Sequence, residues 1–144
     1  MKALIQRVKS ASVKIDGKLY SKINTGLLVF LGIEKTDTKE NADKLADKIL
    51  KLRIFEDENE KMNFSIKNIE GEILSVSQFT LCGDCSKGTR PSFDNAMNPN
   101  DALKMYEYFN EILRGEISLK TGVFGAMMDV ELINDGPVTF MIEK

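Results

Sequence analysis

The chain has 144 residues, the length of one ordinary domain, and we expect residues 1–144 to form a single folded unit. With 42% hydrophobic and 29% charged residues it is typical of a soluble globular protein, and no apolar run approaches the roughly 20 residues of a membrane span. Its formal charge of −2 excludes the strongly positive overall field that favours binding to DNA, so any contact with RNA must come from a local patch. The first apolar run is short and is broken by Gln6 and Arg7, unlike a signal peptide, and we therefore expect a cytosolic protein.

The first half of the chain alternates between strand and helix patterns. Residues 4–17 alternate in polarity and end in Asp-Gly, which predicts two strands meeting at a tight turn. The apolar run at 25–33 predicts a buried strand, and residues 53–65 predict a short strand, a charged turn and a return. Between them, residues 36–52 predict an amphipathic helix whose buried face carries Ala42, Leu45, Ala46, Ile49 and Leu50.

The second half begins with an alternating run, residues 71–81, that predicts a central strand. A polar loop follows at 82–100, and a second helix is predicted to start near Asn98-Pro99. The chain should end in a β-hairpin, with strands at 126–133 and 138–142. Short antiparallel strands interrupted by two helices indicate an α+β fold, with the sheets curled into a barrel-like core. We expect the second helix to turn inward Ala102, Tyr106, Phe109, Ile112 and Leu113.

The absence of histidine limits the chemistry of this chain. Every Ser-His or Cys-His nucleophile is excluded, and so is a histidine general base. Cys82 and Cys85 have CxxC spacing, which suits a redox pair or half of a metal site, but a structural zinc ion normally needs four Cys or His ligands. We therefore expect two reduced thiols and neither metal nor cofactor.

Polar residues close to the end of the predicted central strand form the first candidate site. Ser77, Gln78 and Thr80 bring donors and acceptors to a buried strand, where polar groups need partners. The loop that follows carries Lys87 and Arg90, which suit contact with phosphate, although two solvated loop charges explain them equally well. A hydroxyl that is simply satisfied within the strand is the alternative for Ser77 and Thr80.

Two further stretches stand out. In TGVFGAMM, glycines on either side of Val123-Phe124 suggest close backbone approach, with Phe124 either lining a pocket or belonging to the core. Methionines 127 and 128 are expected in the core or at an interface. In INDGPVTF, the Asp-Gly pair signals a hairpin turn, but Pro137 directly after Gly136 removes a backbone donor where the returning strand should begin to pair.

Six motifs in the same order make this chain resemble the D-aminoacyl-tRNA deacylases, formerly called D-tyrosyl-tRNA deacylases, from end to end. They are QRVKSASV at 6–13, LRIFEDENEKMN at 52–63, SQFTL at 77–81, KGTRPSF at 87–93, TGVFGAM at 121–127 and NDGPVT at 134–139. The resemblance implies an enzyme that hydrolyses the ester joining a D-amino acid, or glycine, to the 3′ end of tRNA. It also implies a homodimer with active sites at the subunit interface.

The resemblance assigns roles to particular residues. Gly136-Pro137 is expected to have a cis peptide bond and to reach into the partner's active site, where its carbonyls screen the chiral centre. A rigid wall on one side of that carbon can discriminate between enantiomers, because the D and L forms differ only in the exchange of the hydrogen and the side chain there. Arg7 is expected to brace this loop, and residues 77–81 to form the opposite wall.

For the reaction itself we favour attack by water. Thr80 matches the threonine once favoured as the family's nucleophile, but no histidine is present to activate it. We expect backbone N–H groups near Phe79 and Thr80 to polarise the carbonyl, the ribose 2′-OH to assist proton transfer, and Thr80 to orient the substrate. The rival functions are a non-catalytic module that binds aminoacyl-tRNA, and a general or L-specific esterase.

Overall fold

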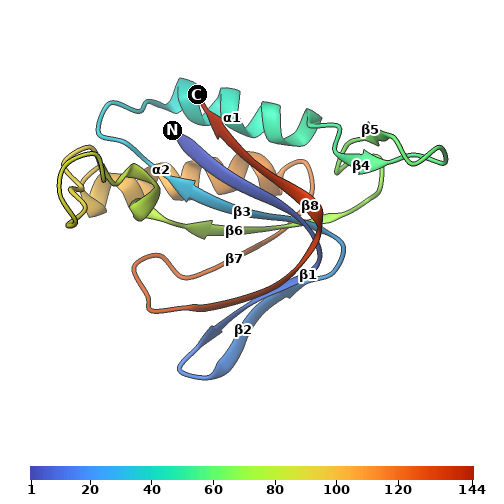
Figure 1. Ribbon diagram of the computed structural model, residues 1–144, viewed down its shortest axis with the longest axis horizontal. Helices are drawn as coiled ribbons and strands as arrows, with labels where there is room; N and C mark the ends of the chain where they lie inside the picture. The colour runs from blue at the N-terminus through green and yellow to red at the C-terminus, as the bar shows by residue number, and fades with distance from the viewer.

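A long first strand organises the sheet, as the computed structural model of residues 1–144 shows (Figure 1). Strand β1 (Lys2–Ile15) pairs along one edge with β2 (Lys18–Ile23) and then with β3 (Gly26–Gly32), both antiparallel. Its other edge pairs with β8 (Asp129–Glu143). The predicted tight turn joins β1 to β2, where Asp16 and Gly17 both have positive φ, as a two-residue hairpin loop requires.

The remaining strands extend the sheet beyond β3. Strand β6 (Glu72–Ser77) pairs with β3, and β7 (Ser118–Thr121) pairs with β6, both in parallel. The sheet is therefore mixed, whereas the sequence led us to expect antiparallel strands, because strand patterning carries no information about the direction of a neighbour. The strands curl until β2 approaches β6 and β7, so the predicted α+β class and barrel-like core are confirmed. Gly26 permits the parallel pairing, since a Cβ there would lie 1.8 Å from the carbonyl oxygen of Glu72.

Both predicted helices are present and cover one side of the sheet (Figure 1). Helix α1 (Lys39–Lys51) begins with a capping box formed by Thr38 and Asn41, and all five residues predicted for its inner face are buried. Helix α2 (Pro99–Arg114) is capped by Asn98, whose side chain accepts a hydrogen bond from the Asp101 backbone. Neither helix has the length and apolarity that crossing a membrane requires.

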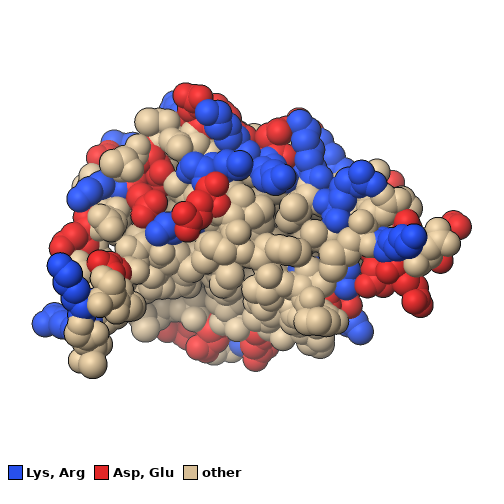
Figure 2. Space-filling model, turned by 45° about the horizontal axis from the view of Figure 1, so that its top comes forward, with Lys and Arg blue, Asp and Glu red and all other residues tan.

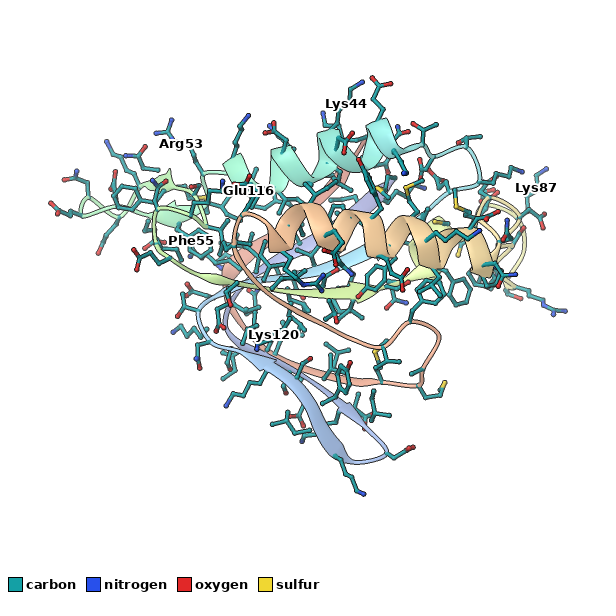
Figure 3. The ribbon with its side chains drawn as sticks, turned by 180° about the vertical axis from the view of Figure 1, so that it is seen from behind. Lys44, Arg53, Phe55, Lys87, Glu116 and Lys120 are labelled. Atoms are coloured by element: carbon teal, nitrogen blue, oxygen red, sulfur yellow. The ribbon has the colours of Figure 1, made fainter.

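The α2 prediction was right for four of five inner residues, since Ile112 is only half-buried. The structure adds Asn110, a polar side chain that is 4% exposed, and which the apolar pattern could not reveal. The hairpin of β4 (Phe55–Glu56) and β5 (Met62–Phe64) follows α1, as the sequence predicted. It lies with Arg53 at one end of the molecule, and the loop carrying Lys87 lies at the other (Figure 3).

Strand β8 corrects the predicted C-terminal hairpin. Its two halves do not pair with each other; both pair with β1, from Asp129 opposite Lys14 to Glu143 opposite Lys2. Gly136-Pro137 therefore sits in an irregularity of one continuous strand, where the register shifts, and not in a reversing turn. The 14-residue β1 offers an edge long enough for both halves, which local turn signals cannot reveal.

The core lies on both faces of the central strands. One cluster fills the space between sheet and helices and includes Leu27, Val29, Leu31 and Phe109. A smaller cluster inside the curl includes Leu28 on the opposite face of β3. Strands β3 and β6 are thus buried on both faces, as is usual for parallel strands beneath helices.

Candidate active site

The polar motif at the end of β6 adopts a short helical turn. Strand β6 ends at Ser77, and Phe79–Cys82 form a 3₁₀ helix, η1, so the strand is shorter than the predicted 71–81. The last pairing bond runs from the Gln78 N–H to the Leu31 carbonyl, at 2.8 Å, next to the end of β3. Gly32 lets η1 pack closely, because a Cβ there would lie 2.9 Å from the Leu81 Cβ.

This turn presents both side chains and backbone donors to solvent. Phe79 is 56% exposed, Thr80 is exposed, and Ser77 and Gln78 are half-buried. The Gln78 side-chain amide donates a hydrogen bond to the Thr80 hydroxyl. The backbone N–H groups of Phe79 and Thr80 bind no acceptor within the chain, so two adjacent donors are free for a ligand.

The loop after η1 closes back on Phe79. Paired backbone bonds between Asp84 and Ser92, at 2.8 and 3.0 Å, hold its base together. Phe93 lies edge-on to Phe79 with ring centroids 5.0 Å apart, a neighbour that sequence reasoning missed because only folding brings the two rings together. The predicted phosphate ligands Lys87 and Arg90 are exposed on this loop and form no ion pair.

The segment after β7 carries Phe124, which was expected either to line a pocket or to belong to the core. The Gly122 N–H donates to the Ser75 carbonyl at 2.9 Å, which starts this segment beside β6. Phe124 is half-buried and packs against the main core, with its ring centroid 5.9 Å from that of Tyr106. Methionines 127 and 128 were expected in the core or at an interface. Met127 is 90% exposed, so it does not belong to the core of the chain.

The Gly136-Pro137 segment has the expected cis peptide bond and is exposed. Arg7, which was expected to brace this segment, is 5% exposed and binds next to it. Its Nε donates to the Asp135 carbonyl at 2.9 Å and lies 3.2 Å from the Asp135 carboxylate. A second nitrogen donates to the Ile54 carbonyl at 2.6 Å, so one guanidinium joins β8 to the chain before β4.

The structure thus separates the candidate residues into two groups within one chain. Residues 77–80 and Phe124 lie at the β6 and β7 side of the sheet, whereas Gly136-Pro137 and Arg7 lie on β8 and β1. Strands β1 and β3 intervene between β8 and β6.

Other features lie away from this turn or lack a reactive arrangement. An open groove of about 590 Å³ between α1 and α2 is lined by mixed charges, including Arg53 and Glu116 (Figure 3), and does not touch residues 77–80. No three acidic, Cys or His side chains gather as a metal site would require. Both cysteines are free thiols; Cys82 is buried, which raises its pKa, and Cys85 is exposed.

Comparison with known proteins identifies the family. A family model described as "D-Tyr-tRNA(Tyr) deacylase" matches residues 4–143. The chain belongs to this deacylase family. A D-aminoacyl-tRNA deacylase of Geotalea daltonii is 58% identical over 144 residues, covering 99% of this chain and 96% of the relative. A D-aminoacyl-tRNA deacylase of Thermodesulfovibrio yellowstonii is 56% identical, with 99% and 98% covered.

Two solved structures have the same fold as this chain. The protein named "c-Myc DNA Unwinding Element Binding Protein" is 44% identical and superimposes with a TM-score of 0.96, covering 100% of this chain and 99% of that one. A structure described as "a probable eukaryotic D-amino acid tRNA deacylase" has a TM-score of 0.84 at 17% identity, covering 99% and 98%, which supports the fold alone. The barrel with its two helices is therefore shared by proteins of widely different sequence.

Proposed function

We propose that this protein hydrolyses the ester bond of D-aminoacyl-tRNA, and of glycine attached to tRNA, and leaves L-aminoacyl-tRNA intact. The names of the 58% and 56% identical relatives support the reaction. The pair of unbound backbone N–H groups at Phe79 and Thr80 is the observation that supports a reaction site at residues 77–80. The cytosol, which holds charged tRNA, is the expected location.

The two N–H groups provide an oxyanion hole. Attack on the ester carbonyl places negative charge on its oxygen, and donors already fixed in position stabilise that charge without reorganising. Removing one such donor typically costs about 10²–10³ in rate, so a pair accounts for a large part of the acceleration. Phe79, exposed beside the donors and supported by Phe93, offers a flat surface for the end of the tRNA.

Water, rather than Thr80, is the nucleophile. A hydroxyl nucleophile needs a base to remove its proton, and the side-chain partner of Thr80 is the Gln78 amide, which donates a hydrogen bond and takes no proton. With its oxygen already accepting from Gln78, the Thr80 hydroxyl keeps its own hydrogen free to orient substrate. The ribose 2′-OH beside the ester then assists proton transfer.

Selection against L-amino acids comes from Gly136-Pro137 of a second subunit, with Arg7 holding the segment in place. This segment is exposed and two strands away from residues 77–80 of its own chain, so a partner must bring it to the site. Exposed apolar side chains support a homodimer, and Figure 2 shows a broad area free of charged residues below the charged upper edge. The exposed apolar side chains include Ile133, Phe140 and Met141 of β8, together with Met127.

The decisive experiment incubates the protein with matched D- and L-tyrosyl-tRNA and follows loss of the ester. Loss of the D ester alone is the expected result. Equal loss of both esters would identify a general esterase, and binding without loss would identify a non-catalytic aminoacyl-tRNA module. Light scattering tests the assembly, since a protein that is monomeric at assay concentration would contradict a wall supplied by a partner.

A further inference from the structure

The carbonyl of Ser75 joins three elements behind the candidate site. It accepts one hydrogen bond from the Gly122 N–H, at 2.9 Å, and another from the Tyr106 hydroxyl, at 2.8 Å. A carbonyl oxygen has two lone pairs, so both are occupied. Strand β6, the segment after β7 and helix α2 thus meet at a single atom, and Figure 3 shows α2 lying along this side of the sheet.

This junction lies directly behind two candidate walls of the site, which are residues 77–80 and the segment that carries Phe124. Ser75 precedes Ser77 by two residues and the free N–H groups by four and five, on the same continuous backbone. Gly122 precedes Phe124 by two residues, and Phe124 also packs on the Tyr106 ring. Tyr106 therefore fixes one wall through its hydroxyl and the other through its ring, without reaching the solvent side of either.

The junction gathers polar side chains in the buried interior. Tyr106 is 4% exposed and Ser75 fully buried, and nearby Asn110 is 4% exposed. The Ser75 hydroxyl and the Asn110 side-chain oxygen are buried without a hydrogen-bond partner, and unsatisfied buried polar groups cost stability. Burial raises the pKa of Tyr106, so its hydroxyl stays protonated and remains a donor at neutral pH.

We propose that Tyr106 is a positioning residue for the deacylation, whose hydroxyl holds the Ser75 carbonyl so that the N–H groups of Phe79 and Thr80 and the Phe124 wall keep a productive spacing. This inference rests on the proposed function. Misplacement of reacting groups by about 1 Å can cost about 100-fold in rate even when the altered residue is remote. Because the hydroxyl acts on geometry and not on binding, its loss lowers kcat and leaves KM nearly unchanged.

The test is Tyr106→Phe, which removes only the hydroxyl. The chain offers a matched control two residues away: the Tyr108 hydroxyl also forms a 2.8 Å hydrogen bond, to Asp43, away from the site. Ile49→Val, on the buried face of α1, controls for a general loss of stability. For the three variants and the wild type we would measure kcat and KM with D-tyrosyl-tRNA, the melting temperature, and hydrogen exchange of the Gly122 amide.

Tyr106→Phe should lower kcat about tenfold or more, keep KM within about twofold, and speed exchange at Gly122. Tyr108→Phe and Ile49→Val should keep the wild-type kcat. A wild type active on D-tyrosyl-tRNA with Tyr106→Phe equally active would overturn this inference and leave the proposed function standing. An inactive wild type would overturn both. A Tyr106→Phe protein that fails to fold, or a kcat loss shared by Ile49→Val, assigns the hydroxyl to general stability and also overturns the positioning role.

Discussion

Arg7 offers the sharpest test of how the Gly136-Pro137 segment is held. Its side chain is buried and donates to the carbonyls of Ile54 and Asp135, at 2.6 and 2.9 Å. Arg7→Met keeps much of the side-chain volume but leaves both carbonyls without this donor. A buried polar group left unsatisfied costs about 1–3 kcal/mol, which applies in full to the buried Ile54 contact and in part to the half-buried Asp135 contact.

The other contacts change this figure little. The carboxylates of Glu56 and Asp135, 3.3 and 3.2 Å from Arg7, are 51% and 34% exposed, and an exposed ion pair contributes about 0–1 kcal/mol. Part of the loss is offset because a charge no longer has to be buried. We therefore expect Arg7→Met to lower the free energy of unfolding by about 3 kcal/mol, which corresponds to a fall of roughly 6–12 °C in Tm for a chain of this size.

Urea and thermal denaturation, followed by circular dichroism at one protein concentration, measure this change. Lys9→Met is the matched control, because Lys9 is an exposed cation on the same strand without an ion pair. It should shift the free energy of unfolding by no more than about 0.5 kcal/mol. If Arg7→Met melted within 2 °C of the control, roughly the size of ordinary surface effects, the reasoning from unsatisfied carbonyls would be refuted.

Three further outcomes are expected. Thr80→Ala should keep most of the deacylation rate, and its complete loss with folding intact would restore Thr80 as the nucleophile. Gly26→Ala should lower stability by several kcal/mol, measured by urea denaturation, because its Cβ would lie 1.8 Å from the Glu72 carbonyl oxygen. A thiol reagent at pH 8 should modify Cys85 at once and Cys82 only after unfolding, because burial raises the Cys82 pKa above its ordinary value of 9.0; rapid modification of both thiols would contradict this.

The raised pKa of Cys82 also determines whether the stability of the folded state rises or falls with pH. A raised pKa means that the folded state holds the Cys82 proton more tightly than the unfolded state does. The associated stability is fully present below the unfolded pKa of 9.0 and declines as pH rises beyond it. Denaturation midpoints that fall between pH 8 and 10 in the wild type, and fall less in Cys82→Ala, would agree with this assignment.

The sequence by itself determined where most elements lie. The 3.6-residue period and the caps located both helices, and Asp16-Gly17 located the first turn, because these signals depend on neighbours within a few residues. The family motifs likewise mark residues 77–81 and Gly136-Pro137 from the sequence alone.

Tertiary structure decided what each segment pairs with. Gly136-Pro137 lies in a continuous β8 because β1, over 120 residues earlier, offers an edge to both of its halves. Residues 79–82 leave the strand because β3 ends at Gly32 and makes room for η1. The burial of Arg7 and the bond from Tyr106 to Ser75 likewise join residues 128, 47 and 31 positions apart. Such contacts depend on strand order and register, which no local pattern encodes, and they decide where each candidate residue lies.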